Sequence, residues 1–135
     1  EEAYGKYIWL KSGASLVIEH TEAMTVIDVN TGSVLKKKKQ EDTLFYQINR
    51  EAAKEIARQL RLRNISGIIM IDFINMKDTA QKEKLLSLLD SECKKDRVHC
   101  NVIDMTALNL VEMTRSKVRK PLHEQIRSCM KNNRS

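Results

Sequence analysis

Alternating apolar and polar residues open the chain and predict three β-strands, at residues 6–10, 15–19 and 24–29. Ser12 and Gly13 form a turn signal between the first two strands, and residues 20–22 join the second strand to the third. Strands connected this tightly favour an antiparallel meander, in which each strand pairs with the next along the chain.

The period of the pattern then changes from that of a strand to that of a helix. From Glu41 onward an apolar residue returns at every fourth position, at Leu44, Ile48, Ala52, Ile56 and Leu60. This spacing predicts an amphipathic helix that ends near Asn64, before the break at Gly67. Residues 67–73 form a short, continuous apolar segment, which predicts a buried strand.

The second half of the chain adds one more helix and two strands. Asp78 or Thr79 is expected to begin the helix, and its apolar face would consist of Leu85, Leu86, Leu89 and Cys93. Residues 98–103 and 108–113 are the last two predicted strands. The order β-β-β-α-β-α-β-β predicts an α/β fold, in which a mixed sheet opens with an antiparallel meander and helices pack on it.

The composition is that of one globular domain with a surplus of positive charge. Of the 135 residues, 41% are hydrophobic and 31% are charged, while aromatic residues, at 4%, are too few to dominate the core. The net charge of +6 favours a polyanionic partner, with nucleic acid first among the candidates. We expect a core subdomain at residues 1–114 and a basic, partly ordered tail at residues 115–135.

The cysteines and the apolar segments indicate where the protein acts. Cys93, Cys100 and Cys129 are odd in number and lack C-x-x-C spacing, which argues against a disulfide framework and favours the reducing cytoplasm. The longest apolar segments are only a few residues, far too short to span a membrane. A cytoplasmic protein without a membrane span is therefore expected.

Two aspartates stand inside apolar segments that are predicted to be strands: Asp28 in VIDVN and Asp72 in IIMIDF. A carboxylate among β-branched residues is costly to bury unless it is paired or bound to a cation. If the two strands are neighbours, both carboxylates reach the same edge of the sheet, and such oxygen ligands suit Mg²⁺. Asn30 shares the strand face of Asp28 and could hold a carboxylate in its metal-binding orientation. The alternative is that the aspartates are ordinary strand-end residues and that Asn30 belongs to a turn.

Other chemistries that use aspartate fit this chain less well. A phosphoaspartate hydrolase of the D-x-D type needs a carboxylate where Asn30 stands, and a receiver domain would alternate strands and helices from its start. No glycine-rich nucleotide motif is present, and His20, His99 and His123 lack the spacing of a zinc site or a catalytic dyad. Metal-assisted chemistry on a phosphodiester is the interpretation that the two aspartates and the basic charge favour.

Positive charge is concentrated near the C-terminal end of the sequence. Arg115, Lys117 and Arg119 occupy alternate positions, and Lys120 follows them. Alternation would place the cations on one face of an extended segment, where they suit contacts to nucleic-acid phosphates that do not read the base sequence. An ordinary solvated edge is the alternative.

Five segments form an ordered set of longer motifs. They are WLKSGASLVI at 9–18, TEAMTVIDVNTG at 21–32, NREAAKEIARQLRLR at 49–63, GIIMIDFINM at 67–76 and LVEMTR at 110–115. Together they resemble the nuclease core of the ribonuclease E/G family over residues 8–125, which is most of the chain.

The resemblance implies a Mg²⁺-dependent endoribonuclease that cuts single-stranded RNA and leaves 5′-phosphate ends, in RNA processing and decay. It implies a deoxyribonuclease-I-like α/β subdomain, in which Asp28 and Asp72 ligate Mg²⁺ and Asn30 orients a carboxylate. The basic residues from Arg115 to Lys120 would then contact RNA phosphates. A non-catalytic RNA-binding or subunit-assembly module is the alternative for the chain in isolation.

The sequence departs from the family pattern at several positions. Asn75 stands where many members have aspartate, residues 108–109 replace a Phe-Gly pair, and His99 replaces an arginine that supports 5′-end recognition in some members. Cys129 is not followed by the second cysteine of the zinc-linking C-P-x-C motif, so the family's tetramer is not expected, while a homodimer remains open. Without the preceding oligonucleotide-binding barrel and 5′ sensor, the sequence is expected to be an excised nuclease subdomain.

Overall fold

Residues 5–32 and 42–117 are described by the structure, a computed structural model of the chain. Their elements, in chain order, are β1 (Lys6–Trp9), β2 (Ser15–His20), β3 (Met24–Asn30), α2 (Asp42–Leu62), β4 (Gly67–Asp72), α3 (Thr79–Lys94), β5 (Cys100–Met105) and β6 (Val111–Arg115). This order confirms the predicted succession of strands and helices, and with it the α/β class.

The last two strands begin later than predicted, and local hydrogen bonds give the reason. β5 begins at residue 100 rather than 98 because the Val98 amide donates to the Asp96 carboxylate at 3.0 Å, which closes a turn just before the strand. β6 begins at residue 111 rather than 108 because the turn after β5 is longer than expected. There the Thr106 amide donates to the Leu110 carbonyl at 2.7 Å, and Asn109 has a left-handed φ of 65° that takes it out of a strand.

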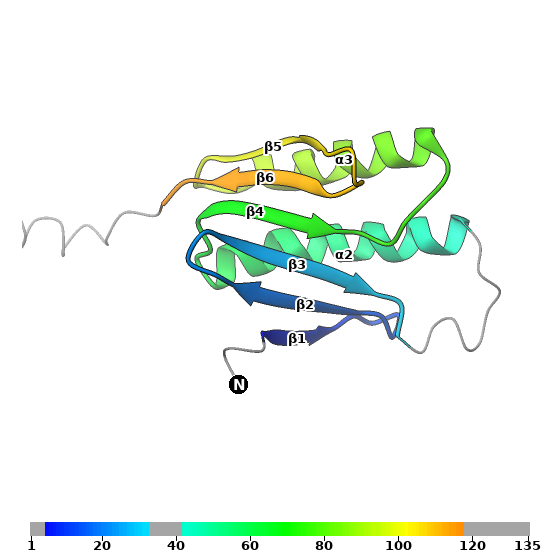
Figure 1. Cartoon of the computed structure of the whole chain (residues 1–135), viewed down its shortest axis with the longest axis horizontal. Helices are drawn as coiled ribbons and strands as arrows, with labels where there is room; N and C mark the ends of the chain where they lie inside the picture. Colours follow the sequence, from blue (N-terminus) through cyan, green and yellow to red (C-terminus); the bar gives the residue numbers. More distant parts are fainter. Residues whose placement is uncertain (1–4, 33–41, 118–135) are drawn as a thin grey trace, which may run out of the picture.

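The six strands of the described residues form a single sheet in the order β1-β2-β3-β4-β6-β5. β1, β2 and β3 form the predicted antiparallel meander. β4 lies parallel to β3 because α2 carries the chain back between them. β6 lies between β4 and β5 and is antiparallel to both, which makes the sheet mixed, as predicted (Figure 1).

Both helices pack against one face of this sheet, and the core lies between the two layers (Figure 1). α2 contributes the predicted series, of which Ile48, Ala52, Ile56 and Leu60 are at most 2% exposed. The buried face of α3 consists of Leu85, Leu89 and Cys93. The strands supply Leu16, Ile18, Ile27, Ile69, Ile71, Val111 and Met113. Each aliphatic side chain buried in this way stabilises the fold by about 1.5–3 kcal/mol.

The ends of the helices follow from local chemistry. Asp78 caps α3, because its carboxylate accepts a hydrogen bond from the Ala80 amide at 2.9 Å. The turn from α2 into β4 passes through Asn64 and Gly67, with φ angles of 55° and 89°. Asparagine and glycine adopt these left-handed conformations more readily than other residues, so the chain can reverse here within a few residues.

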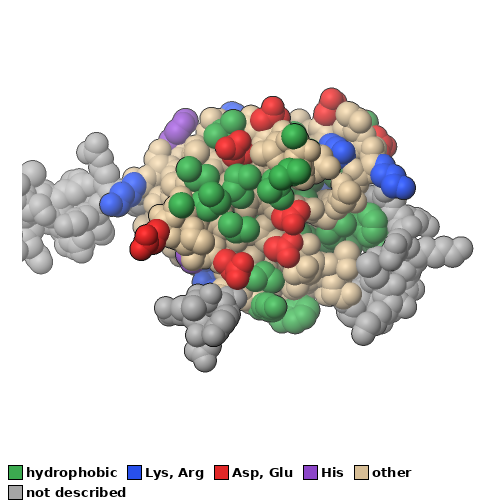
Figure 2. All heavy atoms as spheres, viewed as in Figure 1, with side chains coloured by type: hydrophobic (Ala, Val, Ile, Leu, Met, Phe, Trp, Pro, Cys, Tyr) green, Lys and Arg blue, Asp and Glu red, His purple; other side chains and the backbone are tan. Residues whose placement is uncertain are grey.

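The other face of the sheet has no helix over it within the described residues, and we call it the open face (Figure 1). Its apolar side chains include Val17, Val26, Ile68 and Met70. Its acidic side chains include Glu19, Asp28, Asp72 and Glu112. Figure 2 looks onto this face and shows hydrophobic and acidic side chains gathered side by side.

Neither α2 nor α3, the helices of the described ranges, combines the length and the apolar character that crossing a lipid bilayer requires.

Candidate functional site

Asp28 and Asp72 lie directly opposite each other at the ends of two neighbouring strands. β3 and β4 are parallel, and the register pairs the Cα atoms of these two aspartates. Neighbouring strands are about 4.8 Å apart, so the two carboxylates share one edge of the open face. The structure therefore brings together the two residues that the sequence singled out, while their role as metal ligands stays a prediction.

The electrostatics of this pair show two like charges held close together. The pKa of Asp28 is raised above its ordinary value, first by partial burial and then by the charge of Asp72. Glu19 adds to the rise, whereas hydrogen bonds from the Asn30 side chain and the Val29 backbone oppose it. The largest influences that raise this pKa are therefore burial and neighbouring negative charge. The pair is thus poised to gain from a cation placed between the two carboxylates.

The donor set of the pair suits a hard cation. The ligands on offer are the carboxylate oxygens of Asp28 and Asp72 and the side-chain oxygen of Asn30. In the described part of the chain, no group of three or more His, Cys, Asp or Glu side chains is placed to hold a metal ion. Mg²⁺ fits a site with two carboxylates, because it commonly takes one or two of them and completes its shell with water and phosphate oxygens.

A buried asparagine on α2 fixes the segment that follows β4. Asn49 is fully buried; its amide donates to the Ile74 carbonyl at 2.9 Å, and its side-chain oxygen accepts from the Ile74 amide at 3.0 Å. Two bonds to one backbone unit, two residues after Asp72, hold the exit of β4 against the helix. Sequence reasoning missed Asn49. The available signal was a polar residue next to Ile48 on the apolar side of a helix, which by itself does not reveal its partner.

Arg115 occupies a different place from the one expected for an RNA contact. Its side chain is 3% exposed, and its Nε lies 2.8 Å from the Oδ2 of Asp96, whose side chain is 4% exposed. Its Nη1 donates to the Ile65 carbonyl at 2.9 Å. Burial raises the pKa of Asp96, but hydrogen bonds from Arg115 and Val98 outweigh it and hold that pKa below its ordinary value. The guanidinium ties β6 to two loops, and this burial corrects the expectation that it contacts phosphate.

The other basic residues of the predicted tail lie far from the aspartate pair or outside the described residues. β6 runs antiparallel to β4, and Arg115 lies opposite Gly67, five residues before Asp72. At about 3.3 Å per residue, the end of β6 is therefore about 17 Å from Asp72. Lys117 is exposed beyond that end. Arg119 and Lys120 fall outside the described residues, so the predicted boundary of a basic tail at residue 115 stays a prediction.

Comparison with known proteins identifies the family. The sequence pattern of the ribonuclease E/G family matches residues 1–118. This chain belongs to the ribonuclease E/G family. The resemblance seen in the motifs is thereby confirmed.

Individual relatives agree with this assignment. Ribonuclease G of Escherichia coli is 45% identical over 122 residues, which cover 90% of this chain and 25% of the relative. Ribonuclease G of Haemophilus influenzae is 47% identical over the same shares of the two chains. Ribonuclease E of a Nostoc species is 41% identical over 123 residues, 91% of this chain and 18% of the relative. The chain thus spans about a quarter or less of the length of these relatives.

Proposed function

We propose that this chain carries the catalytic centre of a Mg²⁺-dependent endoribonuclease that cuts single-stranded RNA. The observation that carries the proposal is the register of β3 and β4, which sets two like-charged carboxylates opposite each other on the open face. Family membership supports it, because the relatives are named ribonuclease G and ribonuclease E. We expect the reaction to leave 5′-phosphate ends and to serve RNA processing and decay.

In this proposal each side chain of the pair has a separate part. Asp28 and Asp72 hold the ion, and Asn30 keeps the carboxylate of Asp28 turned toward it through a hydrogen bond. When bound, Mg²⁺ would polarise the scissile phosphate and help to generate hydroxide from bound water. The water oxygen bonds to phosphorus while the bond from phosphorus to the 3′ oxygen breaks. The phosphate then stays on the 5′ oxygen of the downstream product, and the upstream product ends in a 3′ hydroxyl after its oxygen takes up a proton.

RNA binding is assigned to basic side chains at a distance from the cut. Lys117, with Arg119 and Lys120, would contact phosphates beyond the end of β6, several nucleotides from the aspartate pair. Arg115 is left out of this set because it is buried in its ion pair. Cys93 and Cys100 are free thiols, which fits a protein that works in the reducing cytoplasm.

The direct test is cleavage of a 5′-monophosphorylated, AU-rich, single-stranded RNA by the full chain, with and without Mg²⁺. We expect cleavage to need Mg²⁺ and to fall more than about 100-fold in Asp28→Asn and in Asp72→Asn, and about 10- to 100-fold in Asn30→Ala. Asp104→Asn is the matched control, because Asp104 is an exposed aspartate of β5 outside the pair. Undiminished cleavage in both aspartate variants would refute the proposal.

A second candidate function is a non-catalytic RNA-binding or subunit-assembly module. The apolar part of the open face favours it, since Ile68 is 44% exposed beside Met70 and Val26, and exposed apolar patches commonly mark contacts between proteins. RNA that is retained equally in chelator and is never cut would support this module. Sedimentation of the chain would show whether it forms the homodimer that the sequence leaves open.

A further inference from the structure

Two aromatic side chains on β1 stand out because they are exposed in a chain with few aromatics. Tyr7 is 66% exposed and Trp9 is 70% exposed. They occupy alternate positions on the strand, so both point to the same side, while Ile8 between them packs against the core. Trp9 is the single tryptophan of the sequence, and large aromatic side chains usually gain stability by burying 150–250 Å².

The sheet register places these aromatics on the open face, in line with the aspartate pair. Tyr7 pairs with Val17, Val17 with Asp28, and Asp28 with Asp72, so these four side chains form one row across four strands. Side chains that lie opposite each other on paired strands project from the same face of a sheet. Tyr7 is therefore two strands, or about 10 Å, from Asp28.

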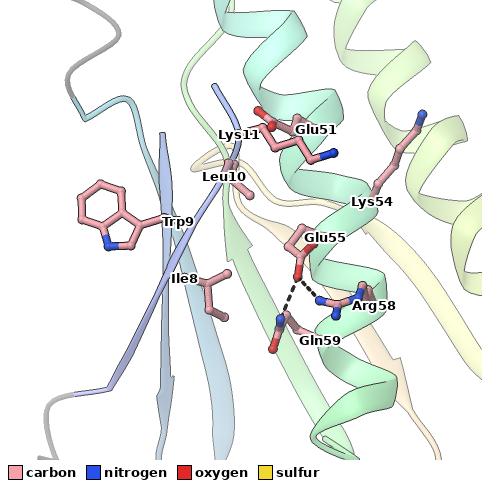
Figure 3. Close-up of a pocket in the computed structure, with 9 residues that line it drawn as sticks. All are labelled: Ile8, Trp9, Leu10, Lys11, Glu51, Lys54, Glu55, Arg58 and Gln59. Carbon is pink, nitrogen blue, oxygen red and sulfur yellow. Dashed lines mark hydrogen bonds and ion pairs between the residues drawn. The ribbon is translucent and has the colours of Figure 1, made fainter. Parts of the chain in front are cut away.

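Trp9 belongs to the next row along the strands. It pairs with Ser15, and Ser15 pairs with Asn30. Figure 3 shows the Trp9 indole pointing away from α2, whereas Ile8 points toward the groove of about 470 Å³ between β1 and that helix. The indole is thus directed to the open face rather than into the groove.

We infer that Tyr7 and Trp9 form a stacking surface for the unpaired bases of an RNA strand whose scissile phosphate lies at Asp28 and Asp72. This inference rests on the proposed function. Aromatic side chains stack on bases of any sequence, and proteins that bind single strands combine such stacking with nearby positive charge. Lys6 projects to the opposite face of β1 from Tyr7, and Lys11 lines the groove beside α2, so stacking rather than a neighbouring lysine of β1 would bind the strand here.

The charge of the open face explains why stacking is needed near the site. Asp28, Asp72 and Glu19 would repel phosphates on both sides of the cut. Uncharged contacts to the bases avoid this repulsion. The 10 Å between Tyr7 and Asp28 corresponds to about three stacked nucleotides, at about 3.4 Å each. The aromatics would therefore bind bases that lie a few nucleotides from the cut.

Intrinsic fluorescence gives a direct test, because Trp9 is the only tryptophan. We expect a 12-nucleotide oligouridylate to quench the fluorescence of the full chain on binding. A strand of the same length and charge made of abasic nucleotides should leave it unchanged. Equal quenching by the abasic strand would overturn the inference, because only phosphate contacts would then be responsible.

Affinity measurements on variants complete the test, with a fluorescently labelled oligouridylate followed by anisotropy. Trp9→Thr and Tyr7→Thr keep the strand-forming character of β1 but remove the stacking faces, and each should weaken binding about 5- to 150-fold. Trp9→Phe should retain most of the affinity. Leu62→Ala is the matched control, because Leu62 is 65% exposed at the end of α2, away from the open face.

The outcomes separate this inference from the proposed function. Mg²⁺-dependent cleavage by the parent with unchanged affinity in both threonine variants would overturn the stacking surface and leave the nuclease proposal standing. Weakened binding in those variants without cleavage by the parent would refute the nuclease proposal and keep the two aromatics as an RNA-binding surface. A dimer that is lost in Trp9→Thr while RNA affinity is unchanged would overturn the inference in favour of contact between two copies of the chain.

Discussion

Replacing Arg115 by alanine should destabilise the fold severely. The change leaves the Asp96 carboxylate, 4% exposed, without its cation, and removes the donor of a 2.9 Å hydrogen bond to the Ile65 carbonyl. Removing one partner of a buried pair costs about 3–5 kcal/mol, because the remaining charge stays buried without compensation. Since the free energy of unfolding of such domains is only about 5–15 kcal/mol, this loss should leave the variant barely stable.

Urea denaturation followed by circular dichroism measures this effect through the shift in the unfolding midpoint. Arg58→Ala is the control, because Arg58 pairs with Glu55 at 2.8 Å but its side chain is 59% exposed. Exposed pairs of this kind contribute at most about 1 kcal/mol. The combination of Arg115→Met with Asp96→Asn should recover part of the loss, since it removes both charges together.

The acid side of the stability profile gives an independent check on the same pair. The pKa of Asp96 is lower in the folded protein than its ordinary value of 3.8. Ionised Asp96 therefore stabilises the fold fully above pH 3.8, and this stabilisation is lost as the pH falls toward the folded pKa. In Arg115→Met the cation that lowers the pKa of Asp96 is absent, so the stability of this variant should fall less at low pH than that of the parent. If Arg115→Ala were no more destabilising than Arg58→Ala and instead weakened RNA binding, the structural role would be refuted and the original expectation of a phosphate contact restored.

Three further predictions concern the site and the cysteines. Asp28→Asn should raise the free energy of unfolding in chelator at pH 7 by about 0.5–1 kcal/mol. The raised pKa of Asp28 means that its ionised form destabilises the fold, so the parent protein loses stability as the pH rises through the folded pKa. Asn49→Ala should cost about 1–3 kcal/mol in urea denaturation, since both polar groups of Ile74 lose a partner, and should also reduce cleavage in the assay above. Cys100 should react with iodoacetamide faster than Cys93, because the two sulfur atoms are 3.1 Å apart and the hydrogen bond between them lowers the pKa of Cys100. Cys93→Ala should slow that reaction.

Each of these predictions has its own control and refuting result. For the aspartate, Mg²⁺ should raise the melting temperature of the parent but not of Asp28→Asn, and equal rises in both would contradict a shared ion. For the asparagine, Asn101→Ala on β5 replaces an exposed residue and should leave stability unchanged. For the cysteines, peptide mapping by mass spectrometry identifies the labelled thiol, and faster labelling of Cys93 would reverse the assignment.

Local pattern in the sequence was sufficient for the elements and for the aspartate pair. Helical spacing from Leu44 to Leu60 predicted α2, and the buried face of that helix follows the same series. Asp28 and Asp72 could be singled out because a carboxylate is unusual inside an apolar strand, although the structure leaves Asp72 exposed and Asp28 only half-buried. The meander was also predictable, since strands joined by short turns pair with their neighbours. These features depend on residues close together in the chain.

Only the tertiary structure decided which distant residues meet. Arg115 was expected to contact phosphate, yet β6 lies between β4 and β5 and carries its guanidinium to Asp96, 19 residues away in sequence. Asn49 of α2 binds Ile74 because the helix packs beside the end of β4. Tyr7 lies in one row with Asp28 because both residues pair with Val17 of β2. Such contacts depend on strand order and register, which are set by packing of the whole core. A local pattern of polar and apolar residues contains neither.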